Sequence, residues 1–193
     1  MGIFDKIFTR KNKDFAATNE LMGEDAFWKI IKNSNLNSKG DYEIQQQELA
    51  KELHKLNPND IIKFYNRFCF LKWEAYTWQL WGAIYIIQGG CGDDSFNDFR
   101  EWVIGQGKEF YYRTIQDPET LVDIDEDEIL IEWEGLGYVP FTLFRELTGH
   151  DMPYLLPEND DTIRNSEPSG QEWEEDDLKQ MFPKLFAKYP DNV

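Results

Sequence analysis

Residues 75–92 form an 18-residue run that contains no charged side chain. A run of this length can cross a lipid bilayer, but a helix that is apolar on all sides also occurs at the centre of a globular core. Gln79, Gly82 and Gln88 interrupt the run, Gly89–Gly90 closes it, and its flanks lack the anchoring pattern of a membrane helix. The sequence therefore predicts a buried core helix and no membrane span.

Apolar residues recur at helical spacing along most of the remaining chain, and aromatic residues make up 16% of the whole. This aromatic content provides enough apolar surface for a sizeable core and excludes a disordered protein. We predict a mainly α fold, with helices over 24–34, 41–56, from 58 onward, 95–104, 108–116 and 136–149. In the second helix, Asp41 is the predicted N-cap, Ile44 is expected on the buried face, and Gln45 is expected to point away from the core.

The predicted organisation is a single compact helical domain with flanking segments. Residues 1–20 form a basic and apolar N-terminal tail, 21–156 the helical core domain, 157–172 an acidic linker, and 173–193 a C-terminal helix that folds back on the domain. Two cysteines are too few for a disulfide scaffold, and no secretory leader opens the sequence. A cytoplasmic location is therefore expected.

Negative charge is concentrated in one part of the chain. The formal net charge is −17, and residues 117–177 contain 20 acidic and two basic residues. Nucleic-acid binding depends on basic side chains that displace counterions, so this distribution argues against a nucleic-acid partner. An acidic segment would attract a basic partner protein, and the predicted partner-binding residues are Asp123, Asp125, Asp127, Glu132 and Glu134. The alternative is that the acids only keep an aromatic-rich domain in solution.

The turn from Gly89 to Asp94 is the best candidate for a ligand site. Its glycines allow a ligand to approach the backbone, and the two carboxylates that end it suit a cationic group or a divalent cation. A pocket around this turn would be lined by Trp78, Trp81, Asp93, Asp94, Arg100 and Trp102. The competing interpretation is structural: one of the two aspartates caps a helix that begins near Ser95.

No other pattern in the sequence points to catalysis. The two histidines, His54 and His150, are isolated, and neither is placed by the sequence to act as a base for a nucleophile, so no catalytic residue is predicted. Both cysteines are expected to be small buried hydrophobes. Four acidic residues between 123 and 134 fall at ligand positions of an EF-hand loop, but Glu128 stands where that loop requires glycine. We therefore predict no metal and no cofactor.

Several short motifs together resemble one bacterial family. They are Phe27-Trp28, Tyr76-Thr77-Trp78-Gln79-Leu80-Trp81-Gly82-Ala83, Gly89-Gly90-Cys91-Gly92-Asp93-Asp94, Phe99-Arg100-Glu101-Trp102 and Glu132-Trp133-Glu134-Gly135-Leu136. Over about residues 24–150 the chain resembles the bacterial domain-of-unknown-function family 4240. The resemblance implies an intracellular, mainly helical bacterial domain, and it implies no particular reaction.

Two classes of function remain open at this point. The first is a non-catalytic protein-binding module of the immunity or inhibitor type, whose acidic surface binds a basic protein. The second is an enzyme or a divalent-metal-binding protein that uses the Gly89–Asp94 turn together with Arg100. A pocket surrounded by charges of both signs would favour the second class, and acids on an open convex face would favour the first.

Overall fold

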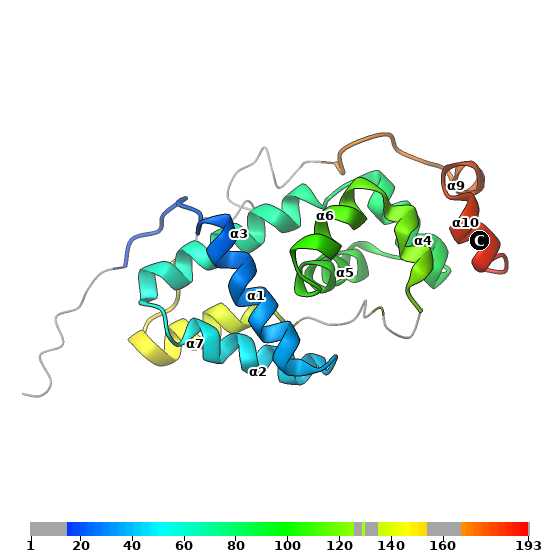
Figure 1. Cartoon of the computed structure of the whole chain (residues 1–193). Helices are drawn as coiled ribbons and strands as arrows, with labels where there is room; N and C mark the ends of the chain where they lie inside the picture. The colour runs from blue at the N-terminus through cyan, green and yellow to red at the C-terminus, as the bar shows by residue number, and fades with distance from the viewer. Residues whose placement is uncertain (1–14, 126–128, 130–134, 154–166, 193) are drawn as a thin grey trace, which may run out of the picture.

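The computed structural model describes residues 15–125, 129, 135–153 and 167–192. In it, helices α1 (Glu24–Ser38) and α2 (Tyr42–Leu53) form a hairpin (Figure 1). The chain reverses at Lys39 and Gly40, whose φ angles are 54° and 86°. The basic residues of the predicted N-terminal tail lie outside the described part of the chain.

Helix α2 begins as the sequence predicts, but its buried face is different. Asp41 accepts a hydrogen bond of 2.9 Å from the backbone amide of Ile44 and so caps the helix. Ile44 is 40% exposed, whereas Gln45 is 1% exposed and shares a face with Leu49 and Leu53, four and eight residues later. The prediction that Ile44 is buried and that Gln45 points away from the core is therefore wrong.

Gln45 is buried because its amide satisfies the end of another helix. Its Nε2 donates to the carbonyl oxygen of Gly105 over 2.8 Å, and Nδ2 of Asn35 donates to the same oxygen over 3.0 Å. Gly105 is the last residue of helix α5 (Asp93–Gly105). The last carbonyls of a helix lack partners within it, so two amides from the α1–α2 hairpin fill this role for α5.

Helix α3 (Pro58–Glu74) runs across the upper part of the molecule in Figure 1, and Asn57 caps its start. Helix α7 (Tyr138–Thr148) packs against both α2 and α3. The rings of Tyr65 and Phe141 meet edge to face at this contact, with centroids 4.5 Å apart. The predicted helices that start near residue 58 and cover about 136–149 are confirmed.

The uncharged run contains helix α4 (Trp78–Gln88), and the prediction of a buried core helix is confirmed. Thr77 caps its start by accepting a hydrogen bond of 3.0 Å from the amide of Leu80, and Gly89, with a φ of 66°, ends it. The buried positions of α4 are Leu80, Gly82, Ala83, Ile84, Ile86 and Ile87. Among the helices that the structure describes, none has the length and apolar character needed to cross a membrane.

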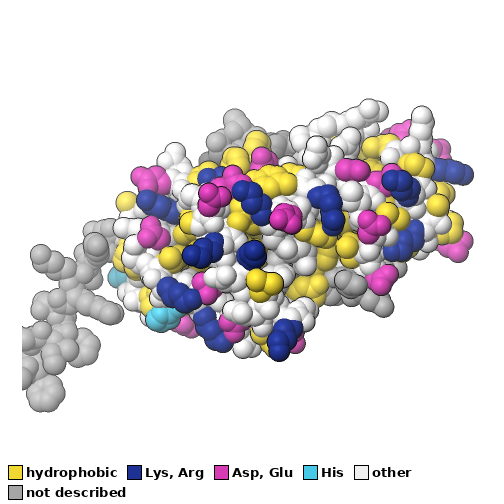
Figure 2. Space-filling model, in the orientation of Figure 1, with side chains coloured by type: hydrophobic (Ala, Val, Ile, Leu, Met, Phe, Trp, Pro, Cys, Tyr) yellow, Lys and Arg dark blue, Asp and Glu magenta, His cyan; other side chains and the backbone are white. Residues whose placement is uncertain are grey.

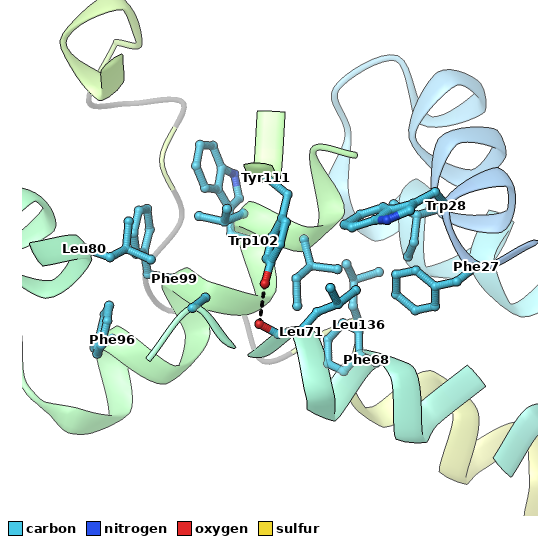
Figure 3. Close-up of a cluster of buried hydrophobic side chains, with 14 of the residues drawn as sticks. Phe27, Trp28, Phe68, Leu71, Leu80, Phe96, Phe99, Trp102, Tyr111 and Leu136 are labelled. Carbon is cyan, nitrogen blue, oxygen red and sulfur yellow. Dashed lines mark hydrogen bonds between the residues drawn. The ribbon is translucent and has the colours of Figure 1, made fainter. Parts of the chain in front are cut away.

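Helix α5 contacts α1, α3 and α6 (Lys108–Gln116) and contributes to the centre of the core. Figure 3 shows the aromatic and aliphatic side chains that meet there. Phe27 of α1 stacks on Phe64 of α3 with ring centroids 4.8 Å apart, and the buried hydroxyl of Tyr111 donates to the carbonyl oxygen of Leu71 over 2.6 Å. Large rings of this kind account for much of the apolar area that folding removes from water.

The C-terminal part contains two short helices where the sequence predicts one. Helices α9 (Glu175–Met181) and α10 (Pro183–Lys188) are separated at Phe182, whose φ and ψ angles are −132° and 65°. Pro183 explains the break, because proline has no amide hydrogen and disfavours helical geometry in the preceding residue. Both helices pack against α4, and α10 also packs against the 3₁₀ helix η2 (Pro118–Asp123), at one end of the molecule (Figure 1).

The described end of the predicted acidic linker is attached to the body. The amide of Ser169 donates to the carbonyl oxygen of Tyr76, and the carbonyl oxygen of Ser169 accepts from the amide of Trp78, both over 2.9 Å. Pro168 beside it is buried. The body therefore holds the linker at Pro168 and Ser169, a contact that the sequence does not predict, and residues 157–166 of the linker lie outside the described part of the chain.

We expect the substitution Gln45→Ala to lower the free energy of unfolding by about 1–2 kcal/mol, because it removes a buried hydrogen bond and leaves a small cavity. Chemical denaturation followed by circular dichroism measures this. The matched control is Gln47→Ala, which changes an exposed glutamine of the same helix and should alter stability by less than about 0.5 kcal/mol. Equal effects of the two substitutions would contradict the role assigned to Gln45.

Candidate functional site

Three aromatic side chains stack beside the turn from Gly89 to Asp94. Trp81 lies between Trp78 and Phe96, with centroid distances of 5.6 and 4.8 Å and interplanar angles of 11° and 16°. The Nε1 of Trp81 also donates to the carbonyl oxygen of Cys91 in the turn, over 2.8 Å. The turn therefore fixes the central ring of a stack supplied by α4 and α5, and two of the predicted pocket residues come together here.

Arg100 joins this stack through cation–π contacts. Its guanidinium carbon lies 4.6 Å from the ring centroid of Tyr76 and 5.0 Å from that of Phe96. Its Nη1 donates to the carbonyl oxygen of Lys72 over 2.9 Å, and its Nε donates to that of Phe96 over 3.3 Å. Burial lowers the pKa of Arg100 to about 10, so the group remains protonated at neutral pH. Arg100 thus links α5 to the end of α3, and its N–H groups donate hydrogen bonds within the protein.

Trp102 lies apart from the stack, in the core shown in Figure 3. Its ring packs against those of Phe99 and Phe110, and its Nε1 donates to the hydroxyl of Tyr42 over 2.9 Å. Two residues along a helix turn through about 200°, so Trp102 and Arg100 point to different sides of α5. The structure therefore does not bring Trp102 together with the other predicted pocket residues.

Asp93 and Asp94 form the first turn of α5, and both are exposed. The helix begins at Asp93, its N-cap residue is Gly92, and no side chain caps it. The prediction that one of the aspartates caps a helix starting near Ser95 is therefore wrong. The extended backbone of Gly92 lets the helix begin earlier, and the two carboxylates remain favourable in its first turn because they face the positive end of the helix dipole.

Cys91 does not have the properties of a nucleophile. Burial, together with the negative charge of Asp93, raises the pKa of its thiol to about 12. A reactive cysteine requires a lowered pKa, because the thiolate is the attacking species. In the part of the chain that the structure describes, no group of three His, Cys, Asp or Glu side chains is arranged to hold a metal ion.

The described partner-binding candidates lie at the end of η2 and just after it. Asp123 and Asp125 are both exposed, and the carboxylate of Asp125 is 4.0 Å from Nζ of Lys188 in α10. The other three candidates lie outside the described residues: Asp127, Glu132 and Glu134. The two described acids are therefore exposed at the surface near α10.

A hollow of about 270 Å³ lies against α7 and is lined by Phe141, Arg145, Asp151 and Met152. None of the predicted pocket residues is among these four. Its two charged side chains are well exposed and form an ion pair with each other, with Nη2 of Arg145 and Oδ1 of Asp151 2.7 Å apart. The hollow therefore does not join the aromatic stack in a single site.

A buried polar cluster that sequence reasoning missed joins α3, α5 and the start of α7. Glu101 is 6% exposed, and its Oε1 accepts a hydrogen bond of 3.0 Å from Nζ of Lys72. Its Oε2 accepts one of 3.0 Å from the amide of Gly137. A Cβ atom at residue 137 would lie 2.8 Å from this carboxylate, so any other residue there would displace the carboxylate from its present position. Glu101 stands within the Phe99–Trp102 motif, but no local signal marks its distant partners.

The fold and the site define a mainly helical protein in which the motif residues hold helices together. Residues 22–146 match the model of a family described as a protein of unknown function (DUF4240). The match covers well over half of the chain, which therefore belongs to this family, as the motifs predict. No curated protein and no solved structure matches the chain.

The substitution Glu101→Gln tests the polar cluster. It leaves the ammonium of Lys72 without its carboxylate, and we expect the free energy of unfolding to fall by about 1–3 kcal/mol. Urea titration measures the change. Glu109→Gln, at an exposed position of α6, is the matched control and should have little effect. A result in which both variants unfold at the wild-type midpoint would contradict the structural role of Glu101.

The raised pKa of Cys91 predicts slow alkylation. In a Cys69→Ser background at pH 8, its thiolate fraction should be about 1000-fold smaller than that of a thiol with an ordinary pKa, and iodoacetamide should react correspondingly slowly. Because the folded pKa lies above the ordinary value, the rate should keep rising up to about pH 11. The same protein in denaturant is the control, and its rate should level off above about pH 10. A folded protein that levels off there too would contradict the prediction.

Proposed function

We propose that this protein is a non-catalytic, cytoplasmic protein-binding module, and that its acidic surface binds a basic partner protein. Immunity and inhibitor proteins that neutralise a basic protein are examples of this class. The proposal includes no nucleic-acid partner, because the acidic surface would repel phosphate groups.

The observation that carries the proposal is that exposed acids from two distant segments lie on elements that pack against the same helix, α10. Asp123 and Asp125 follow one another at the end of η2, and residues 174–177 supply four consecutive acids at the start of α9. All six are exposed, and both elements pack against α10. Carboxylates gathered at one end of a molecule produce a field that accelerates encounter with a positively charged protein.

The lysines of α10 offset only part of this charge, because two lysines stand against six exposed acids. Nζ of Lys188 donates to the carbonyl oxygens of Val122 and Ile124, over 2.9 and 2.8 Å. The other lysine, Lys184, has its Nζ 3.7 Å from the carboxylate of Glu119. Both cations therefore lie against η2, where Nζ of Lys188 is also 4.0 Å from the carboxylate of Asp125, and the four acids at the start of α9 remain exposed.

The distribution of charge elsewhere supports the same assignment. On the face seen in Figure 2, which includes α1, α3 and α6, dark blue basic side chains and magenta acidic ones are interspersed. This agrees with the near neutrality of the sequence outside residues 117–177. An interspersed surface has a weak long-range field, so directional attraction of a basic protein would come from the acidic segment.

The enzymatic alternative has less support from the described residues. Arg100 uses its donors on backbone carbonyls, and Cys91 has a raised pKa. Asp93 and Asp94 are exposed, and their side chains lie in the first turn of a helix. These features provide neither a positioned base nor an activated nucleophile next to the stack.

The test is an association-rate measurement with the partner recovered by affinity purification from the native host. The variant carries Asp125→Asn, Asp127→Asn, Glu132→Gln and Glu134→Gln. We expect it to associate about three- to tenfold more slowly at low salt and to show a flatter salt dependence, because charges at the edge of an interface act mainly on encounter. Stopped-flow fluorescence at two salt concentrations measures both effects.

The matched control removes the same amount of charge from outside the acidic segment: Asp25→Asn, Glu43→Gln, Asp94→Asn and Glu109→Gln, all at exposed positions. Its association rate should stay close to that of the wild type. A recovered partner that is itself acidic, or equal rates for the two variants, would leave the acids with a solubilising role only.

A further inference from the structure

The C-terminal strap, defined as residues 167–192, covers the outer side of α4 and lies outside the matched range 22–146. Trp173 begins the contact: its Nε1 donates to the carbonyl oxygen of Trp78 over 2.7 Å, and its ring lies 5.1 Å from that of Tyr85. Figure 1 shows α9 and α10 stacked beside α4 at the end of the molecule. The outer side of α4, which belongs to the matched range, is therefore covered in this chain by a segment outside that range.

Gly82 forms a notch in the covered face. A Cβ atom placed there would lie 3.0 Å from Cδ2 of Leu178, 3.0 Å from Nε1 of Trp173 and 3.1 Å from Cε2 of Phe182. Three side chains of the strap thus converge on the one position of α4 that has no side chain. Alanine is the better helix former, and glycine at this position matches the need for close packing.

Polar bonds at both ends hold the strap in one register. Ser169 bonds to the backbone on either side of Thr77, and the hydroxyl of Tyr85 donates to the carboxylate of Glu175. At the other end, Nδ2 of Asn192 donates to the carbonyl oxygens of Ile86 and Ile87, over 3.2 and 2.7 Å. These are the otherwise unpaired carbonyls at the end of α4, so the strap also caps that helix.

The same features make the strap separable from the domain. Helices α9 and α10 contain seven and six residues, too few to be stable without the surface they pack on. Three side chains of the strap helices and their junction are buried: Leu178, Phe182 and Leu185. A terminal segment made of two short helices can open at a lower free energy than the whole domain, in a local unfolding reaction.

We propose that the C-terminal strap is a releasable occupant of a docking groove on α4, centred on Gly82 and flanked by Trp78 and Tyr85. The groove binds an amphipathic helical segment. In this chain that segment is the strap itself, which contacts the groove through Trp173, Leu178 and Phe182. Opening of the strap exposes the groove while the helices α1–α7 stay folded. The inference concerns the apolar side of the strap and does not depend on a basic partner.

Amide hydrogen exchange of the full-length protein tests the release. The amides of Phe182, Phe186 and Tyr189, which bond within the strap, should exchange at least about tenfold faster than buried amides of α3 and α5. Their exchange should also depend only weakly on denaturant, as expected for a local opening. Equal protection and equal denaturant dependence would overturn the proposal, because the strap would then open only with the whole fold.

The substitution Gly82→Ala fills the notch and should speed exchange of those three strap amides a further tenfold or so, while leaving α3 unchanged. Gln79→Ala is the matched control: it lies on the same helix, is exposed, and raises helix propensity without filling the notch. The control should exchange like the wild type. If the two variants behave alike, the notch has no part in holding the strap.

Binding in trans completes the test. The probe is a fluorescent synthetic peptide of residues 167–192, and the host is the full-length chain with Trp173→Ala and Leu178→Ala, which loosen its own strap. The host should bind the peptide at least about tenfold more tightly than the wild type, and addition of Gly82→Ala should abolish binding. A host that melts cooperatively and shows a helical circular dichroism spectrum, yet binds no peptide, would overturn the proposal.

Discussion

Helix α4 has no charged side chain and buries six of its residues, and the covering of this apolar surface orders much of the molecule. Leaving apolar area in water costs about 25 cal/mol for each Å². η2 contacts α4, Phe96 of α5 stacks on Trp81, and α9 and α10 pack against its outer side. The three segments follow α4 at increasing distances along the chain. The apolar helix is thus the element around which they assemble.

The features that the sequence predicts correctly are those whose causes lie within a few residues. Asp41 and Asn57 cap helices through amides three residues later, and the run 75–92 is apolar by composition alone. The start of α5 shows the limit of such signals. The sequence predicts Asp93 or Asp94 as the cap, whereas the backbone conformation of Gly92, which the sequence does not encode uniquely, lets the helix begin at Asp93.

The features that escape prediction depend on partners far along the chain. The amide of Gln45 bonds to a carbonyl 60 residues away, and Glu101 bonds to an amide 36 residues away. Nothing next to either residue distinguishes it from an exposed polar side chain. Part of the candidate site can be predicted from helix spacing. Trp78 and Trp81 are three residues apart and must lie next to each other on the helix, whereas Arg100 and Trp102 are two residues apart and cannot share a face.

The strap poses an electrostatic problem, because an acidic segment docks on an already acidic protein. The order of charge along it provides the solution. Its acids come first, where the Glu174 and Asp177 capping box and the positive end of the α9 dipole favour them. Its lysines come later, where α10 meets the acids and carbonyl oxygens of η2. In the reversed order, lysines would meet the positive end of the α9 dipole and acids would meet the acids of η2, and both contacts would be repulsive. The order of charges therefore helps fix the direction in which the strap lies on α4.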